Sequence, residues 1–91
     1  MDLYRKIEAT PTFDFKGSIV GMYIFKDQIT KVLITKEKTI NRNMIKINLY
    51  FRGKKEFSTR VKKDNYNKYT VDDMLKWFWF SKRSLSFVKG V

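Results

Sequence analysis

The chain contains no cysteine and no histidine. The first absence excludes disulfides and thiolate metal sites, and it favours an intracellular protein over a secreted one. The second removes the commonest metal ligand and the only side chain that ordinarily titrates near neutral pH. Paired carboxylates, the other usual means of general acid-base catalysis, do not stand out either. We therefore expect no metal, no cofactor and no enzymatic activity.

Other common signals are also missing. No apolar run reaches the roughly 18 residues of a membrane span. The first ten residues, MDLYRKIEAT, lack the apolar core of a signal peptide. The four glycines match no phosphate-binding loop. Alanine occurs once while lysine, isoleucine and asparagine are abundant, which indicates an AT-rich genome such as that of a low-GC bacterium or a phage. We predict a cytoplasmic protein of a bacterial or phage-infected cell, with no membrane partner.

Ninety-one residues are enough for one domain, which we take as residues 1–91. Aromatic residues make up 16% of the chain, and each buried one removes roughly 150–250 Å² from water. The apolar share of 43% is too high for a disordered chain. The composition therefore predicts a small folded domain with an aromatic core.

Alternation of apolar and polar residues predicts a chain that is mostly strand. Ser18–Phe25 is apolar on both faces, so it is expected to be a central strand, and Gly21 within it indicates a bulge or a close backbone approach. The other expected strands are Leu3–Glu8, Ile29–Thr35, Met44–Arg52 and Glu56–Lys62, with loops at 36–43 and 63–69. The expected fold is α+β and β-rich, either an antiparallel sheet or a small open barrel of about five to seven short strands.

A single helix is expected over about residues 70–82. Thr70 and Asp73 resemble a capping box, and Val71, Met74, Leu75 and Phe78 follow the helical i, i+3, i+4, i+7 spacing. After it, Leu85 and Phe87 alternate with serines, which predicts a short closing strand.

The hairpin of Met44–Arg52 and Glu56–Lys62 has a register that its hydrophobic pattern should select. An odd loop of Gly53, Lys54 and Lys55 pairs Phe51 with Phe57 and keeps apolar residues on one face. The same register places on the other face the pairs Lys46–Lys62, Asn48–Arg60, Tyr50–Ser58 and Arg52–Glu56. Lys46 and Lys62 would then be a like-charge pair, which proteins tolerate where an anion binds.

The net charge of +11 lies entirely in residues 31–91, because the four cations and four anions of residues 1–30 cancel. Residues 46–69 hold eight lysines and arginines together with three tyrosines. Cations neutralise phosphates and aromatic rings stack on bases, so this composition predicts a small nucleic-acid-binding protein, for single-stranded DNA or RNA. The predicted binding residues are Lys46, Tyr50, Arg52, Lys54, Lys55, Arg60, Lys62, Lys63, Tyr66 and Tyr69.

Four consecutive aromatic residues, 77–80, cannot all face one core. They either clamp the helix against the sheet or form an exposed knob, and the candidate interface residues are Trp77, Trp79 and Phe80, for a homodimer or another protein. An alternative function follows, that of a phage or mobile-element inhibitor which binds an acidic host protein or a protein–nucleic acid complex. A third possibility is a ribonuclease toxin that works without histidine. The alternative without a binding function is that the basic residues only form a solvated surface.

Overall fold

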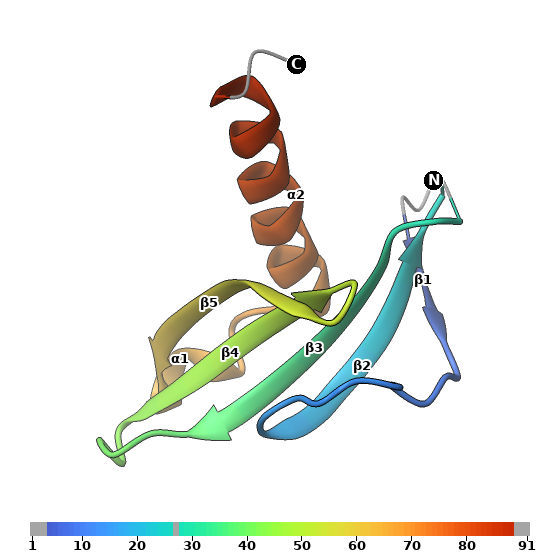
Figure 1. Cartoon of the computed structure of the whole chain (residues 1–91). Helices are drawn as coiled ribbons and strands as arrows, with labels where there is room; N and C mark the ends of the chain where they lie inside the picture. Colours follow the sequence, from blue (N-terminus) through green and yellow to red (C-terminus); the bar gives the residue numbers. More distant parts are fainter. Residues whose placement is uncertain (1–3, 27, 89–91) are drawn as a thin grey trace.

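The computed structural model describes residues 4–26 and 28–88, with side chains as far as Trp79. Its strands form one open antiparallel sheet in chain order (Figure 1). The strands are β1 (Tyr4–Ile7), β2 (Ser18–Phe25), β3 (Lys31–Lys38), β4 (Met44–Phe51) and β5 (Lys54–Lys62), and the helices are α1 (Lys63–Tyr66) and α2 (Val71–Val88). The predicted β-rich α+β class is confirmed, in the form of an open sheet.

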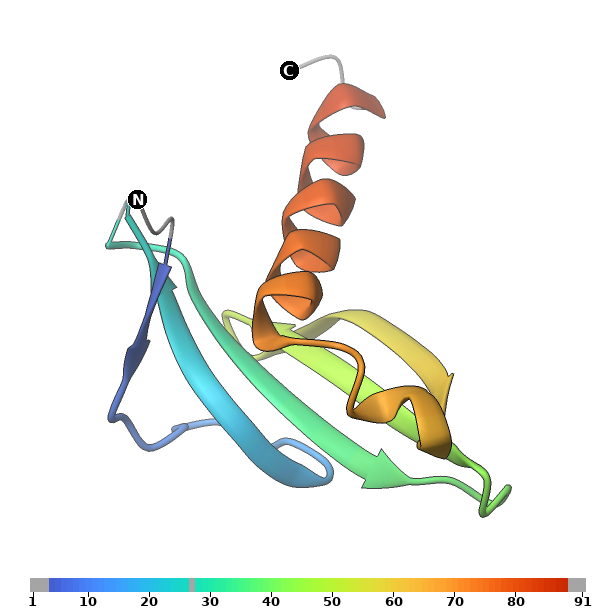
Figure 2. The ribbon, with the colours of Figure 1, turned by 180° about the vertical axis from the view of Figure 1, so that it is seen from behind.

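Both helices lie on one side of the sheet, here called the helix face (Figure 2). The first turns of α2 bury Met74, Leu75 and Phe78 against the strands. Their partners on the sheet are Tyr23, Phe25, Val32, Ile34, Ile47, Leu49 and Val61. Beyond this contact α2 extends past the sheet, as both ribbon views show.

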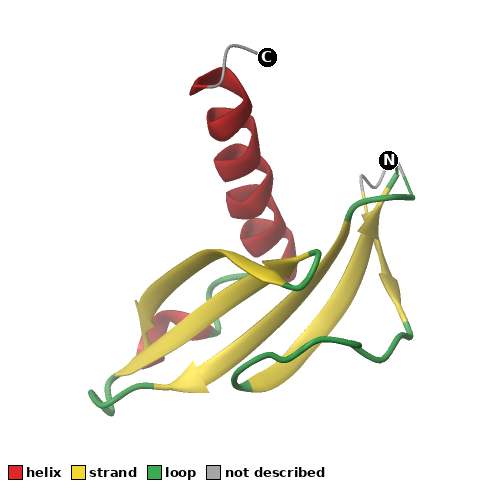
Figure 3. Cartoon of the chain, in the orientation of Figure 1, coloured by secondary structure: helices red, strands yellow, loops and turns green. Residues whose placement is uncertain are grey.

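The opposite side, the strap face, is covered in part by an irregular segment of residues 8–17, here called the strap (Figure 3). Phe13 and Phe15 of the strap pack against a small second core of Met22, Leu33 and Tyr50. The alternation of apolar and charged residues in the strap therefore serves to cover one face.

β2 has the predicted bounds and is covered on both faces. Met22 belongs to the core under the strap, while Tyr23 and Phe25 belong to the core under α2. The pairing with β3 shifts between Ile19 and Gly21, which confirms the expected bulge. A Cβ at Gly21 would lie 2.8 Å from the Tyr23 hydroxyl, so the ring of Tyr23 occupies the space that a larger residue would need.

The predicted capping box starts α2. The Thr70 amide donates to the Asp73 carboxylate at 2.9 Å, and the Asp73 amide donates to the Thr70 hydroxyl at 3.1 Å. The closing strand expected at Leu85 and Phe87 is wrong, because α2 continues through these residues to Val88. No glycine or proline interrupts residues 71–88, so the helix meets no residue that would stop it.

Two segments expected to be loops contain regular secondary structure. β3 begins at Lys31 and continues to Lys38, so the loop shrinks to residues 39–43. The stretch after β5 forms the single turn of α1.

The register predicted for the β4–β5 hairpin is wrong by two residues. Arg52 and Gly53 form a two-residue turn, with positive φ angles of 54° and 79°, the combination that tight hairpins require. Glu56 is then an extra, bulged residue between the pairs Leu49–Phe57 and Tyr50–Lys55. The bulge restores the alternation that a short turn alone would reverse, so the predicted faces are correct although the predicted partners are not.

Candidate nucleic-acid interface

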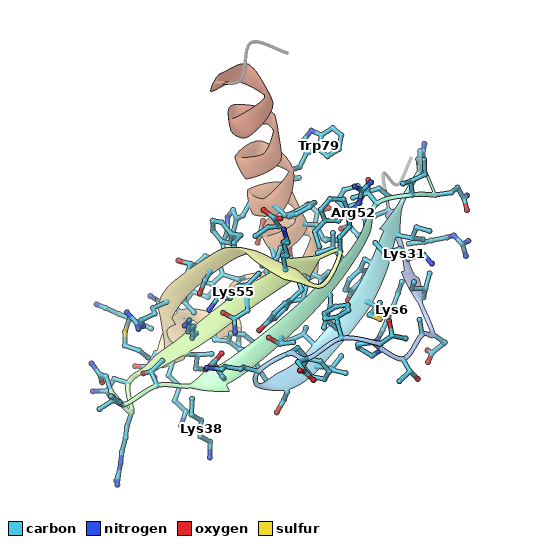
Figure 4. The ribbon with its side chains drawn as sticks, viewed as in Figure 1. Lys6, Lys31, Lys38, Arg52, Lys55 and Trp79 are labelled. Carbon is cyan, nitrogen blue, oxygen red and sulfur yellow. The ribbon has the colours of Figure 1, made fainter. Side chains whose placement is uncertain are left out.

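Three of the predicted binding residues gather on the strap face of β4 and β5, and we call them the Lys46 cluster: Lys46, Lys55 and Arg60. Lys46 is paired with Arg60 across the two strands, in place of the expected partner Lys62, which pairs with Met44. Lys55 is paired with Tyr50. Figure 4 shows Lys55 on the side of the sheet away from the helices. The like-charge pair predicted for this hairpin therefore exists with a different partner.

The members of the Lys46 cluster repel one another. The pKa of Lys46 is lowered, and the charge of Lys55 is the largest cause. Partial burial and the charge of Arg60 act in the same direction, while the carboxylate of Glu37 opposes them. Lys46 and Lys55 therefore approach each other closely although both carry the same charge.

A polar network lies between the two lysines. The Asn48 amide, which is fully buried, donates to the Glu37 carboxylate at 2.6 Å and to the Thr35 hydroxyl at 3.4 Å. The Ser58 hydroxyl donates to Asn48 Oδ1 at 2.9 Å. Asn48 faces Ser58, rather than the predicted Arg60. Its amide holds the carboxylate of Glu37, which is paired with Lys46 on the neighbouring strand β3. This network was not predicted from the sequence. An asparagine that alternates with apolar residues along a strand indicates a polar face, but it does not indicate which side chains the amide will contact.

Tyr50 is not at the exposed centre of a polar face. Only 6% of its surface is exposed. Phe13 of the strap packs on its ring with centroids 6.0 Å apart, and the Lys16 amide donates to its hydroxyl at 3.1 Å. The predicted exposure of Tyr50 is therefore wrong, because the strap covers the face of the ring on which a base would have to stack.

Tyr66 and Tyr69 are half-buried beside the helix-face core. The Lys36 ammonium lies 5.1 Å from the ring centroid of Tyr66. The ring of Tyr69 meets the ring of Trp77 edge to face, with centroids 5.2 Å apart. Both rings thus have packing roles, and neither lies on the strap face with the Lys46 cluster.

The remaining predicted cations are exposed but spread over several surfaces. Arg52 is in the hairpin turn, with its guanidinium 5.1 Å from the ring centroid of Phe51, and it is not paired with Glu56. Lys54 is paired with Phe51, and alternation places it on the side opposite Lys55. Lys62 ends β5 on the strap face, and Lys63 begins α1.

A second group of cations surrounds a hollow of 680 Å³ at the end of the sheet where β3 turns into β4. It includes Lys36, Lys38, Arg42 and Lys63, and Ile45 contributes apolar surface. The Lys63 amide donates to the Asn43 carbonyl at 2.7 Å, which ties α1 to this turn. From the sequence, Lys36, Lys38 and Arg42 are assigned only to a loop, since their approach to Lys63 depends on the tertiary fold.

The aromatic cluster divides along α2. Trp77 is half-buried, and its ring packs on that of Phe57 with centroids 6.1 Å apart. Trp79 is 40% exposed and stacks on Phe25, with centroids 5.6 Å apart and an interplanar angle of 25°. The side chain of Phe80 lies outside the described residues.

The site has few features beyond charge. Within residues 4–26 and 28–88, no group of three or more carboxylates that could hold a metal ion is found, and no helix is long and apolar enough to cross a membrane. Comparison of the chain with known protein families, curated proteins and solved structures found no match. The functional argument therefore depends on this chain's own residues.

Proposed function

We propose that the protein binds nucleic acid through the strap face of β4 and β5. The observation that supports this most is the Lys46 cluster, in which Lys46 and Arg60 are directly opposite each other across β4 and β5 and Lys55 projects from the same face. The backbone pairing keeps the stems of Lys46 and Arg60 side by side on the sheet, whichever way their flexible ends turn. Like charges held together on a sheet cost stability, and an anion between them removes that cost.

The cluster has little internal neutralisation. Among the side chains that the structure describes, the ion pair found is that of Lys76 with Asp72, which is on α2. Glu37 offsets part of the charge on Lys46 and also accepts a hydrogen bond from the Asn48 amide, and Glu56 is next to Lys55 in the chain, so three cations face two carboxylates. The phosphates of a nucleic acid would supply the missing negative charge.

The basic surface continues from the cluster toward the end of the sheet. Arg60 and Lys62 alternate along β5 on the strap face, and Lys63 follows directly at the edge of the hollow. Arg42 lines the same hollow. A strand of phosphates could follow this line of cations from the sheet face to its end, as in other electrostatic binding grooves.

Binding of labelled single-stranded DNA, single-stranded RNA and duplex DNA over a series of salt concentrations tests the proposal. Log affinity should fall linearly with log salt, and Lys46→Gln, Lys55→Gln and Arg60→Gln should each reduce the slope by about 1. Lys6→Gln is the matched control, because Lys6 is an exposed cation on β1, at the other edge of the sheet. A flat salt response, or equal losses in the Lys6 variant, would refute the proposal.

The same experiment separates the alternatives. Cleavage of the RNA would indicate the ribonuclease. Absence of nucleic-acid binding at low salt, together with Lys46-dependent binding to a defined acidic protein, would indicate the alternative function of an inhibitor that binds a host protein. In both cases the Lys6 control should behave as wild type.

A further inference from the structure

Trp79 is an exposed aromatic ring that the structure holds in place. Its indole stacks on Phe25 with centroids 5.6 Å apart, and Phe25 itself is only 7% exposed. The exposed 40% of Trp79 therefore belongs to a ring whose orientation is already fixed on a buried support. A ring held in this way loses little conformational freedom when another ring stacks on it.

Two exposed cations belong to the segments that support this ring. Lys26 is exposed and directly follows Phe25 in the chain. Arg52 lies over Phe51, and Phe51 packs on Phe78, the residue before Trp79, with centroids 5.7 Å apart. Figure 4 shows Trp79 and Arg52 toward the same end of the molecule, where α2 leaves the sheet.

We propose that Trp79 stacks on a base of single-stranded nucleic acid while Arg52 and Lys26 contact its phosphates. This inference rests on the proposed function and adds a preference for single strands. Bases of a duplex are already stacked on one another, so only an unpaired base offers its face to an indole. Trp79 thereby takes the role that the sequence predicted for Tyr50.

The hairpin turn connects Trp79 to the Lys46 cluster. Arg52 is at the turn, Lys54 follows on the side of Phe51, and Lys55 belongs to the cluster. A strand whose base lies on Trp79 can cross this turn with its phosphates on these cations. The occupant that fits an exposed ring bordered by cations is thus a polyanion that carries aromatic groups.

The two tryptophans allow a direct test, because the chain has only Trp77 and Trp79. Trp77→Phe leaves Trp79 as the single tryptophan, which is excited at wavelengths where tyrosine does not absorb, and Trp79→Phe leaves the half-buried Trp77 as the matched control. Each variant is titrated with oligothymidylate of about ten nucleotides, a length within the usual site sizes. Inorganic polyphosphate, which has charge but no bases, is titrated in parallel.

Emission of Trp79 should be quenched by oligothymidylate and not by polyphosphate, while emission of Trp77 should change little. Trp79→Ala should weaken single-strand binding about 5- to 100-fold and duplex binding much less. Arg52→Asn, which keeps a residue that tolerates positive φ in the turn, should weaken both forms.

The outcomes separate the two proposals. Salt-dependent binding of labelled oligothymidylate without quenching of Trp79 overturns the stacking role and leaves the proposed function standing. Absence of binding overturns both. A blue shift of Trp79 emission that depends on protein concentration alone would show that a second copy of the chain covers the ring, and it would also overturn the stacking role.

Discussion

The backbone amide of Lys16 donates a hydrogen bond to the hydroxyl of Tyr50, 34 residues along the chain, at 3.1 Å. This contact attaches the strap to β4. It makes Tyr50 a structural anchor and removes it from the binding surface.

Tyr50→Phe should lower the free energy of unfolding by about 0.5–1.5 kcal/mol, because the Lys16 amide loses its acceptor. Tyr50→Ala should cost about 3–5 kcal/mol, since the ring is buried between Phe13 and the sheet. Urea unfolding measures both. Oligonucleotide affinity of Tyr50→Phe should equal that of wild type, and a loss of several-fold in the folded variant would contradict the anchoring role.

Asn48→Ala should lower the free energy of unfolding by about 2 kcal/mol or more, because the substitution leaves the Glu37 carboxylate and the Ser58 hydroxyl without this partner. Ser58→Ala should cost less, about 1 kcal/mol, since Asn48 keeps its contact with Glu37. Denaturant midpoints of the two variants test the order, and an equal or reversed order would mean that the network does not depend on Asn48.

Asp72 links α2 to β1 and should make stability depend on acid pH. A hydrogen bond from Lys76 is the main cause that holds the pKa of Asp72 below its ordinary value of 3.8, and a hydrogen bond from the Tyr4 hydroxyl, at 2.5 Å, acts in the same direction. A lowered carboxyl pKa stabilises the fold above the unfolded-state value, and this stabilisation is lost as the pH falls through the folded-state value.

Asp72→Asn should therefore reduce stability at neutral pH and flatten its decline below about pH 4. Thermal unfolding over a pH series measures the change. Asp64→Asn is the matched carboxylate control, because Asp64 is an exposed residue of α1 and is not among the contacts that join Asp72 to Tyr4 and Lys76.

Lys55→Gln should raise the pKa of Lys46 toward its ordinary value of 10.5, because the charge of Lys55 is the main cause of the lowered value. Nuclear magnetic resonance of the lysine side chains over an alkaline titration measures it. Oligonucleotide binding to the wild-type protein should raise the same pKa, since phosphates favour the charged ammonium, so affinity should weaken as Lys46 loses its proton. A pKa of Lys46 unmoved by both changes would show that the two lysines are not close.

Sequence alternation was sufficient to assign residues of the β4–β5 hairpin to faces but not to partners. A three-residue loop and a two-residue turn followed by one bulged residue produce the same alternation, so Phe57 could face either Phe51 or Leu49. The choice depends on whether Arg52 and Gly53 adopt positive φ angles, as they do. Glycine indicates this turn, and arginine at the preceding position does not.

The sequence of β4 and β5 alone could not predict that Tyr50, on their polar face, is buried. Tyr50 shares one face of β4 with Lys46 and Asn48, and the pattern is the same whether or not another segment covers the ring. The cover comes from Phe13 of the strap, which is remote in the chain. The start of helix α2, in contrast, was predictable, because Thr70 and Asp73 form a local capping box. Its end was not, because no glycine or proline in residues 71–88 marks where the helix stops.

β5 is the edge strand opposite β1, and its far side pairs with no other strand of the part of the chain that the structure describes. Such an edge can recruit a strand from another molecule, and natural proteins prevent this with lysines. Lys54, Lys55, Arg60 and Lys62 supply that protection here by mutual repulsion between copies. A bound polyanion that neutralises them would also remove the repulsion, so loading the strap face should lower the barrier to edge-to-edge association of two copies.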